Sequence, residues 1–270
     1  MLRLGFLGAG KMAHALANGF LAAGLTKADA IIASCDPSDN SSIESFQKLG
    51  ANVLFCNSSV MKQCNVIFLA VKPVVVPLVL SDIKPVISEK HLLLSIAMGI
   101  SIEEIEMSLP KDVRVIRVMP NTPATVRCAA SVFSCGSAAR PEDINLTKKL
   151  FGSIGTCEEV PETYMDPITA LSGSGPAYVY AIMEALCTGG VRMGLPRELA
   201  RRLVTQTVLG AAKTAVESNQ HLSQLCDDVT SPAGSTAEAL YWLEQSRLRA
   251  ALIGAVEVAT KKCKEVNLKR

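Results

Sequence analysis

The sequence predicts an α/β protein whose first half alternates strands with helices and whose second half is helical throughout. Short runs of aliphatic and β-branched residues recur through the first half, as they do in buried parallel strands. Helical stretches separate these runs, and that alternation indicates a parallel, doubly wound sheet. From Asp166 onward only helical periodicity remains.

The expected elements follow one another in chain order. Strands are expected at residues 2–7, 30–34, 53–55, 66–71, 92–96 and 113–118. Helices of the first half are expected at residues 11–23, 41–49, 74–83 and 102–109. Helices of the second half are expected at residues 177–192, 196–217, 236–244 and 247–266, with Pro176 well placed as a first helical residue.

The change from alternating strands and helices to helices alone predicts two domains, residues 1–162 and residues 163–270. One helix of the second domain carries an apolar stripe that is too broad for a single buried face. Its members are Leu199, Leu203, Val204, Val208, Ala211, Ala212, Ala215 and Val216. We therefore expect these helices to associate with a second copy of the chain. The alternative is one bundle that packs on the first domain.

Composition excludes several classes of protein. Hydrophobic residues make up 49% and charged residues 19% of the chain, which is typical of a large core and not of disorder. The formal net charge of +2 argues against a nucleic-acid partner. The basic end, residues 261–270, is expected to be a solvated helix end. No apolar run reaches the roughly 20 residues that a membrane span needs, and Met1 leads directly into a strand without a secretory leader.

Cysteine and histidine usage predicts neither disulfides nor a metal site. The chain has 9 cysteines, an odd number without a Cys-x-x-Cys pair. Most of them are expected to be small buried hydrophobes in a reducing compartment, and the lack of a presequence favours the cytoplasm. The 3 histidines lie far apart, so no zinc site is expected.

A glycine-rich turn at the first strand–helix junction predicts dinucleotide binding. In Gly8-Ala9-Gly10-Lys11-Met12-Ala13, the first glycine permits a tight turn and the second lets a pyrophosphate approach the backbone. The alanine lets the helix pack closely on the strand. The helix N-terminus then faces the anion. The alternative is a tight turn with a structural role only.

Two further strand ends bear on the cofactor. The second strand ends at Ser34-Cys35-Asp36-Pro37, where an acid would favour NAD and hydroxyl or amide groups would tolerate the phosphate of NADP. The pattern leans weakly to NADPH over NADH, and Asp36 is equally plausible as a turn residue. Lys72, after another strand, can meet the cofactor's phosphate or ribose, or be a solvated loop lysine.

Four later segments carry a specific resemblance. They are residues 119–123 (MPNTP), residues 171–178 (LSGSGPAY), residues 193–196 (MGLP) and residues 228–236 (DVTSPAGST). In order and spacing they closely resemble the pyrroline-5-carboxylate reductase family. The resemblance runs from residue 3 to about residue 266, and residues 228–244 resemble the family's signature.

The resemblance implies a fold, an assembly and an activity. It implies an amino-terminal Rossmann dinucleotide-binding domain followed by an all-helical dimerisation domain. Homodimers interlock through those helices and often assemble into a decamer, and the active site lies between one subunit's nucleotide domain and its partner's helices. The implied activity, the last step of proline biosynthesis, is hydride transfer from NADPH or NADH to a small cyclic imine, giving L-proline.

The resemblance also implies site residues. For the cofactor they are Leu7, Gly8, Ala9, Gly10, Lys11, Met12, Ser34, Cys35, Asn57, Ala70, Val71, Lys72, Pro73, Ile96, Ala97, Met98 and Asp228. For the substrate they are Glu162, Ser231, Ser235 and Thr236. Thr236 is the expected catalytic residue, which either orients the imine nitrogen or relays a proton to it. No metal is expected.

Two positions depart from the family pattern. Ala233-Gly234-Ser235-Thr236 stands where many members have Gly-Gly-Ala-Thr or Gly-Gly-Thr-Thr, which backbone contacts would tolerate. Asp228 replaces a frequent asparagine, and its negative charge puts that cofactor contact in question.

Two rival functions stay open at this point. A β-hydroxyacid dehydrogenase would need a catalytic lysine after the domain boundary, where the first lysine is Lys213 in an apolar helix. A non-catalytic NADP-sensing protein would have no use for the serine- and threonine-rich segments. The preference between NADH and NADPH, feedback by proline, and a mitochondrial rather than cytoplasmic location are also open.

Overall fold

The computed structural model describes residues 2–268. Contacts between Cα atoms divide the chain into two compact units. The sheet unit comprises the residues up to 174 together with those from 259 onward, and the helical unit comprises residues 175–258. The predicted domain boundary between residues 162 and 163 stays a prediction, because compactness alone does not define a functional domain.

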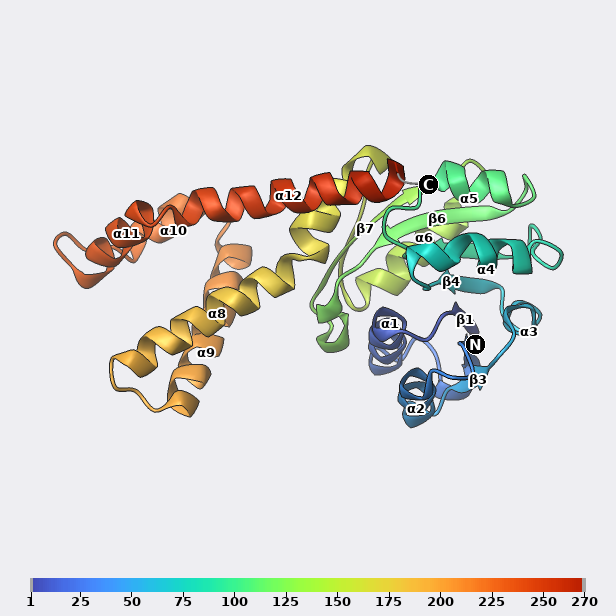
Figure 1. Ribbon diagram of the computed structural model, residues 1–270, viewed down its shortest axis with the longest axis horizontal. Helices are drawn as coiled ribbons and strands as arrows, with labels where there is room; N and C mark the ends of the chain where they lie inside the picture. The colour runs from blue at the N-terminus through green and yellow to red at the C-terminus, as the bar shows by residue number, and fades with distance from the viewer. Residues whose placement is uncertain (1, 269–270) are drawn as a thin grey trace. The chain divides into compact units, whose positions relative to one another are not determined.

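Eight strands form one sheet in the order β3-β2-β1-β4-β5-β6-β7-β8 (Figure 1). They are β1 (Leu4–Leu7), β2 (Ile31–Ser34), β3 (Asn52–Leu54), β4 (Val66–Leu69), β5 (Leu92–Ser95), β6 (Arg114–Met119), β7 (Ala129–Cys135) and β8 (Gly155–Glu159). Strands β1 to β6 are parallel, as predicted. The expectation of an all-parallel sheet is wrong at β7, which pairs antiparallel with β6.

The helices of the sheet unit cover both faces of this sheet. The α-helices are α1 (Lys11–Ala22), α2 (Asn40–Lys48), α3 (Asn57–Met61), α4 (Val76–Ile83), α5 (Ile102–Ser108), α6 (Pro141–Gly152) and α7 (Met165–Ile168). Short 3₁₀ turns are η1 (Ala28–Ala30), η2 (Pro73–Val75), η3 (Thr122–Val126) and η4 (Glu162–Tyr164), and η5 (Thr169–Gly173) is a π-helical turn. One core cluster takes residues from α1, α2 and α6, and the other takes residues from α3, α4 and α5.

Phenylalanine rings fill the α1 side of the core. Phe6 of β1 stacks on Phe68 of β4 with ring centroids 4.6 Å apart, and Phe46 of α2 meets Phe6 edge-on. Phe20 and Phe151 close the cluster from α1 and α6. Since all five rings are fully buried, they hold β1, β4 and α1 in register with one another.

The predicted elements agree with the structure to within about two residues at their ends, a normal uncertainty of helix and strand boundaries. β7, β8, α3, α6, α7 and α10 (Leu222–Asp228) were not predicted. β8 is a mostly polar edge strand and α3 has only 5 residues, so neither carries a clear hydrophobic period. α8 begins at Gly175, so Pro176 is its second residue rather than its first.

The helical unit leaves most of its apolar side chains uncovered. It contains α8 (Gly175–Arg192), α9 (Arg197–Ser218), α10, α11 (Ser235–Gln245) and the first part of α12 (Leu248–Leu268) (Figure 1). Among residues 175–258 only Cys187 and Ala200 are buried. Leu203, Leu209 and Val216 of α9 are 52%, 58% and 80% exposed. This exposure favours the prediction that a second copy covers these helices.

Two sequence expectations concern membranes and the chain end. No helix among the described residues is long and apolar enough to cross a membrane. The basic end lies on α12, and its residues 269 and 270 fall outside the described residues. One side chain of that segment, Cys263, is buried in the sheet unit.

His91 is a buried histidine with a structural role. Its Nδ1 accepts the Ser88 N–H at 3.0 Å, and its Nε2 lies 3.0 Å from the Met61 carbonyl oxygen. The neutral ring with its proton on Nε2 satisfies both partners. Burial lowers the pKa of His91, and Lys90 and Arg114 add to this effect, while the backbone hydrogen bonds oppose it.

The lowered pKa of His91 predicts a loss of stability in mild acid. An unfolded histidine titrates near pH 6.5, so the stabilisation is fully present above about pH 6.5 and is lost as the pH falls through the lower pKa of the folded state. Between about pH 7 and about pH 5, we expect Tm to fall further in the parent than in His91→Gln. Each 1 kcal/mol of unfolding free energy that is lost lowers Tm by about 2–4 °C. Equal pH dependence of thermal unfolding in the two proteins would contradict this role.

Candidate nucleotide-binding site

The candidate site lies where the order of the strands reverses. After β1 the chain builds β2 and β3 on one side, then returns to place β4 on the other side of β1. The loops after β1, β2 and β4 therefore meet at the carboxyl edge of the sheet. Open α/β sheets bind ligands at such a switch point.

Gly8 makes the first turn of the site possible. Its φ of +101° is in the region that favours glycine. A Cβ at this position would lie 2.8 Å from both the Ala70 carbonyl oxygen and a methyl group of Val71. The Gly8 N–H also donates to the Ser34 carbonyl at 2.9 Å. The turn is thus held against the ends of β2 and β4 and has no room for a side chain.

Gly10 has a different role from Gly8. Its φ is −71°, which any residue can adopt, and a Cβ built there meets nothing within 4 Å. Gly10 is the N-cap of α1, and no side chain of the described residues caps this helix. The first-turn N–H groups of α1 therefore face open space at the positive end of the helix, where a pyrophosphate would be stabilised. Ala13, 0% exposed, keeps α1 close to the sheet as predicted.

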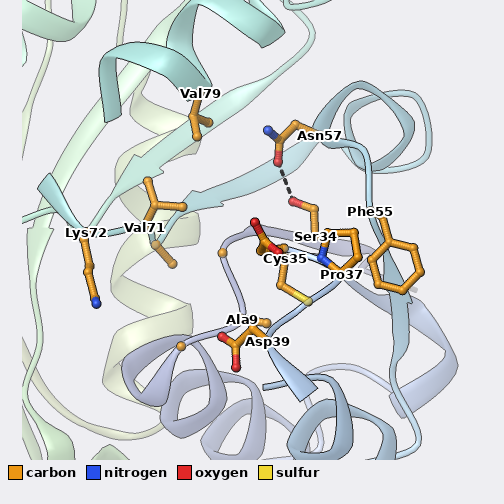
Figure 2. A pocket seen from close by; sticks show the side chains of 14 residues that line it. Ala9, Ser34, Cys35, Pro37, Asp39, Phe55, Asn57, Val71, Lys72 and Val79 are labelled. Atoms are coloured by element: carbon orange, nitrogen blue, oxygen red, sulfur yellow. Dashed lines mark hydrogen bonds between the residues drawn. The ribbon is translucent and has the colours of Figure 1, made fainter. Parts of the chain in front are cut away.

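A cavity of about 400 Å³ opens from this turn (Figure 2). Its lining contains predicted cofactor residues from the ends of β1, β2 and β4 and from the start of α3, namely Gly8, Ala9, Gly10, Ser34, Cys35, Asn57, Ala70, Val71 and Lys72. The other lining residues are Asp36, Pro37, Asp39, Phe55 and Val79. The structure therefore brings the predicted pyrophosphate turn and the predicted ribose end together in one pocket.

The remaining predicted cofactor residues lie outside this lining. Lys11 borders an adjoining hollow with His14, Ser41, Ser42 and Ser45. Leu7 is fully buried in β1, and Met12 packs against the core. Pro73 begins η2, and residues 96–98 follow β5 at the same edge of the sheet, with Met98 exposed. Contacts of these residues with a cofactor stay predictions.

Carboxylates and one lysine set the electrostatics of the ribose end. Asp36 accepts hydrogen bonds from the Ser38 N–H (2.8 Å) and hydroxyl (2.6 Å), which lower its pKa. Asp36 therefore stabilises a turn and also lines the pocket. Asp39 caps α2 through the Ser42 N–H, which lowers its pKa, with a smaller contribution from Lys72. Two ionised carboxylates thus flank this end of the cavity.

Cys35 also lies at this end, and burial raises the pKa of its thiol, with smaller contributions from Asp39 and Asp36.

Ser34 donates its hydroxyl to Asn57 Oδ1 at 2.6 Å, and Asn57 Nδ2 donates to Asp82 at 2.8 Å. Among the described residues, no group of three or more His, Cys, Asp or Glu side chains could hold a metal ion.

Glu162, a predicted substrate residue, is engaged within the sheet unit. Its Oε1 accepts the Ile102 N–H at 2.8 Å and lies 2.9 Å from Nη1 of Arg117. Arg117 is 4% exposed, and its Nη2 lies 3.8 Å from Asp166. The Glu162 carboxylate therefore joins α5, β6 and η4. Its contact with substrate stays a prediction, and the arginine accounts for the acid at this position.

The other predicted substrate residues lie in the helical unit. Ala233 has a left-handed φ of +56°, and the Gly234 N–H donates to the Ser231 carbonyl at 3.0 Å. α11 begins at Ser235, and Gly234 caps it without a side-chain hydrogen bond from the described residues. The N–H groups near Thr236 therefore form an open helix start that suits an anion.

Asp228 closes α10 and accepts a hydrogen bond from Gln224 at 2.8 Å. Its predicted cofactor contact stays untested. Asp39 and Asp82 are the polar residues that sequence reasoning missed. The N-cap pattern of α2 could have indicated Asp39, whereas nothing in the sequence places Asp82 beside Asn57.

Comparisons with known proteins match both halves of the chain. A family model described as pyrroline-5-carboxylate reductase dimerisation matches residues 162–266, and one described as NADP oxidoreductase, coenzyme F420-dependent, matches residues 3–99. Pyrroline-5-carboxylate reductase 2 of Bos taurus is 43% identical over 268 residues, covering 98% of this chain and 84% of that protein. Pyrroline-5-carboxylate reductase of Pisum sativum is 46% identical over 265 residues, covering 98% and 96%.

A solved structure gives the same result for the fold. The crystal structure of Plasmodium falciparum pyrroline carboxylate reductase with NADP bound superposes with a TM-score of 0.90 at 34% identity. The superposition covers 98% of each chain.

Replacing Gly10 by valine tests the nucleotide pocket. Since a Cβ at Gly10 meets no protein atom within 4 Å, we expect Gly10→Val to fold normally and to lose nucleotide binding by at least about a hundredfold, because the branched side chain fills the pyrophosphate space. Titration calorimetry with NADPH measures the binding, and Tm reports the fold.

Gly8→Ala is the matched comparison, because it places a Cβ against backbone at a positive φ and should lower Tm itself. A Gly10→Val protein that binds NADPH like the parent would show that the turn has a structural role only.

Proposed function

This chain belongs to the pyrroline-5-carboxylate reductase family, and we propose that it transfers hydride from NADPH or NADH to the cyclic imine pyrroline-5-carboxylate, giving L-proline. The observation that supports this most is the pocket at the Gly8–Gly10 turn, in a chain that matches these reductases over 98% of its length. The test is oxidation of reduced nicotinamide that depends on added imine. Nucleotide binding without imine-dependent turnover would exclude the proposal.

The residues of the pocket fit a dinucleotide. The open space at Gly10 and the uncapped first turn of α1 suit a pyrophosphate. Ser34 at the end of β2 and Asn57 at the start of α3 suit an adenosine ribose. The reduced nicotinamide supplies the hydride when it is bound, and the chain's residues hold it at the carboxyl edge of the sheet.

The chemistry explains why strong acid–base residues are not required. A cyclic imine is most electrophilic when it is protonated, and hydride arrival at its ring carbon removes the positive charge without creating an oxyanion. An oxyanion hole is therefore less important than for a carbonyl reductase. The site mainly aligns two rings and holds the substrate carboxylate, and such alignment contributes about 7–11 kcal/mol at its upper limit.

The start of α11 suits the substrate carboxylate. Its first-turn N–H groups at Ser235 and Thr236 lack side-chain caps among the described residues, and the positive end of a helix favours an anion. The Thr236 hydroxyl is then available to hydrogen-bond the imine nitrogen. Backbone contacts would tolerate Ser235 in place of the alanine or threonine of many family members.

The rival functions lack support from the structure. Lys213 pairs with Glu217 of the same helix at 3.7 Å, and its side chain is 71% exposed. Lys213 therefore lies on the surface of the helix and not in an apolar environment. Because its ion-pair partner is a glutamate of the same helix, this lysine does not support a β-hydroxyacid dehydrogenase. A non-catalytic NADP sensor is distinguished by the absence of imine-dependent turnover.

We propose that the dimerisation domain forms a homodimer and that dimers assemble into a decamer in the cytoplasm. The exposed apolar side chains of the helical unit support the dimer. The nine cysteines are all free thiols, which suits a reducing compartment. The expectation that most of them are buried is wrong, because only Cys64, Cys187 and Cys263 are. Native mass spectrometry distinguishes the dimer from the decamer.

Thr236 is proposed to orient the imine nitrogen. Thr236→Ala removes one hydrogen bond to a charged group, which costs about 1.5–3 kcal/mol, so kcat/KM for the imine should fall about ten- to a hundredfold. Cofactor affinity should barely change. Thr236→Val, nearly isosteric, should behave like alanine if hydrogen bonding is the cause. Unchanged kcat/KM in both variants would remove Thr236 from the mechanism.

The dimer interface is testable on α9. Leu203 is apolar and 52% exposed in the single chain, so Leu203→Asp should place a charge in the interface, give monomers by light scattering and abolish turnover. The matched control is Gln206→Asp, which adds the same charge at a polar, exposed position of the same helix and should stay oligomeric. A stable, active Leu203→Asp monomer would contradict both the interface and a shared active site.

A further inference from the structure

Two hydrogen bonds connect the nucleotide pocket to an acidic side chain outside its lining. The Ser34 hydroxyl donates to Asn57 Oδ1 at 2.6 Å, and Asn57 Nδ2 donates to Asp82 Oδ2 at 2.8 Å. Ser34 and Asn57 line the cavity (Figure 2), whereas Asp82 belongs to α4. We call these three side chains the Ser34–Asn57–Asp82 relay.

The direction of the relay is set by Asp82. A carboxylate accepts hydrogen bonds and cannot donate them, so Asn57 must turn its NH₂ group toward Asp82 and its oxygen toward Ser34. The single hydroxyl proton of Ser34 then points to Asn57. The other nearby partner of that hydroxyl, the Phe6 carbonyl at 3.4 Å, is also an acceptor. In either orientation the Ser34 oxygen presents only lone pairs to the pocket.

This polarity matters because Ser34 is the last residue of β2. In dinucleotide-binding folds the end of the second strand faces the adenosine ribose, where NADH has a 2′-hydroxyl and NADPH a 2′-phosphate. A hydroxyl can donate to the Ser34 oxygen. A doubly ionised phosphate has only hydrogen-bond acceptors. It can therefore bind the Ser34 hydroxyl only if that hydroxyl breaks its hydrogen bond to Asn57.

We propose that Asp82, acting through Asn57 and Ser34, is a specificity-determining residue that shifts selectivity away from NADPH and toward NADH. The proposal rests on the proposed function insofar as the pocket binds these dinucleotides. The preference of the whole site also includes Lys72, which favours a phosphate, and Asp36 and Asp39, which oppose one. The contribution of Asp82 is separable from theirs because Asp82 reaches the pocket through two hydrogen bonds.

Asp82→Asn tests the relay with the full-length chain. The amide at residue 82 can donate to Asn57, which lets Asn57 turn its NH₂ group toward Ser34 and frees the Ser34 hydroxyl to donate into the pocket. Calorimetric titrations with NADH and NADPH give the two Kd values. We expect the ratio of Kd for NADPH to Kd for NADH to fall about tenfold. Asp82 is exposed, so Tm should not change.

Ser81→Lys is the control for charge. Ser81 precedes Asp82 on α4 and is exposed, and this substitution changes the net charge by the same +1 while the relay stays intact. Its Kd ratio should match that of the parent. A fall in the ratio as large as that of Asp82→Asn would assign the effect to long-range charge and overturn the proposal.

Ser34→Ala shows whether Asp82 acts through the hydroxyl. In the Ser34→Ala background, Asp82→Asn should have no further effect on the Kd ratio, since the two side chains belong to one relay. A tenfold effect that persists in this background would overturn the proposed route. Asp82→Ser, whose hydroxyl can also donate, is the second variant if Asp82→Asn lowers Tm, and the same fall in the ratio is expected of it.

The outcomes separate this inference from the proposed function. If both dinucleotides bind the parent and the ratio does not move in Asp82→Asn or Asp82→Ser, the role of Asp82 is wrong and the proposed function stands. If neither dinucleotide binds the parent, the proposed function fails together with this inference.

Discussion

The close approach of the first turn to the end of β4 is the constraint on which the rest of the site depends. A side chain at Gly8 would collide with the Ala70 carbonyl, and the Gly8 N–H is bonded to the end of β2. Three strand ends are thereby drawn together, and α1 starts with its free N–H groups facing the resulting cavity. The stacked Phe6 and Phe68 rings beneath this turn keep β1 and β4 in the required register.

The two units differ in how much of their apolar surface they bury. The sheet unit covers its strands with helices on both faces and has its own core. Among residues 175–258 only Cys187 and Ala200 are buried, so most of the apolar side chains of the helical unit are left for a partner to cover. Because the proposed substrate residues Ser231, Ser235 and Thr236 lie in that unit, association of two chains and completion of the active site are expected to depend on the same helices.

The acidic residues near the site are engaged in structure rather than poised for proton transfer. Asp36 holds a turn, Asp39 caps α2, and Glu162 pairs with the buried Arg117. What is left for a ligand is mainly backbone N–H groups and neutral side chains. This suits reduction of a protonated imine, in which hydride arrival neutralises a charge and alignment dominates. Acid–base strength is correspondingly less important than the direction of each hydrogen bond.

The sequence by itself determined the α/β class, the strands β1 to β6, the helical second half and the nucleotide turn, because hydrophobic period and glycine spacing are local signals. The resemblance implied that Ser34, Asn57 and Lys72 share a cofactor site, and the structure places all three along one pocket. Their contacts with a cofactor stay a prediction. Only the tertiary structure decided that β7 runs antiparallel, that Arg117 takes up the Glu162 carboxylate, and that Asp82 faces Asn57. These are pairings between residues distant in sequence, and chain folding alone brings their side chains within hydrogen-bonding distance.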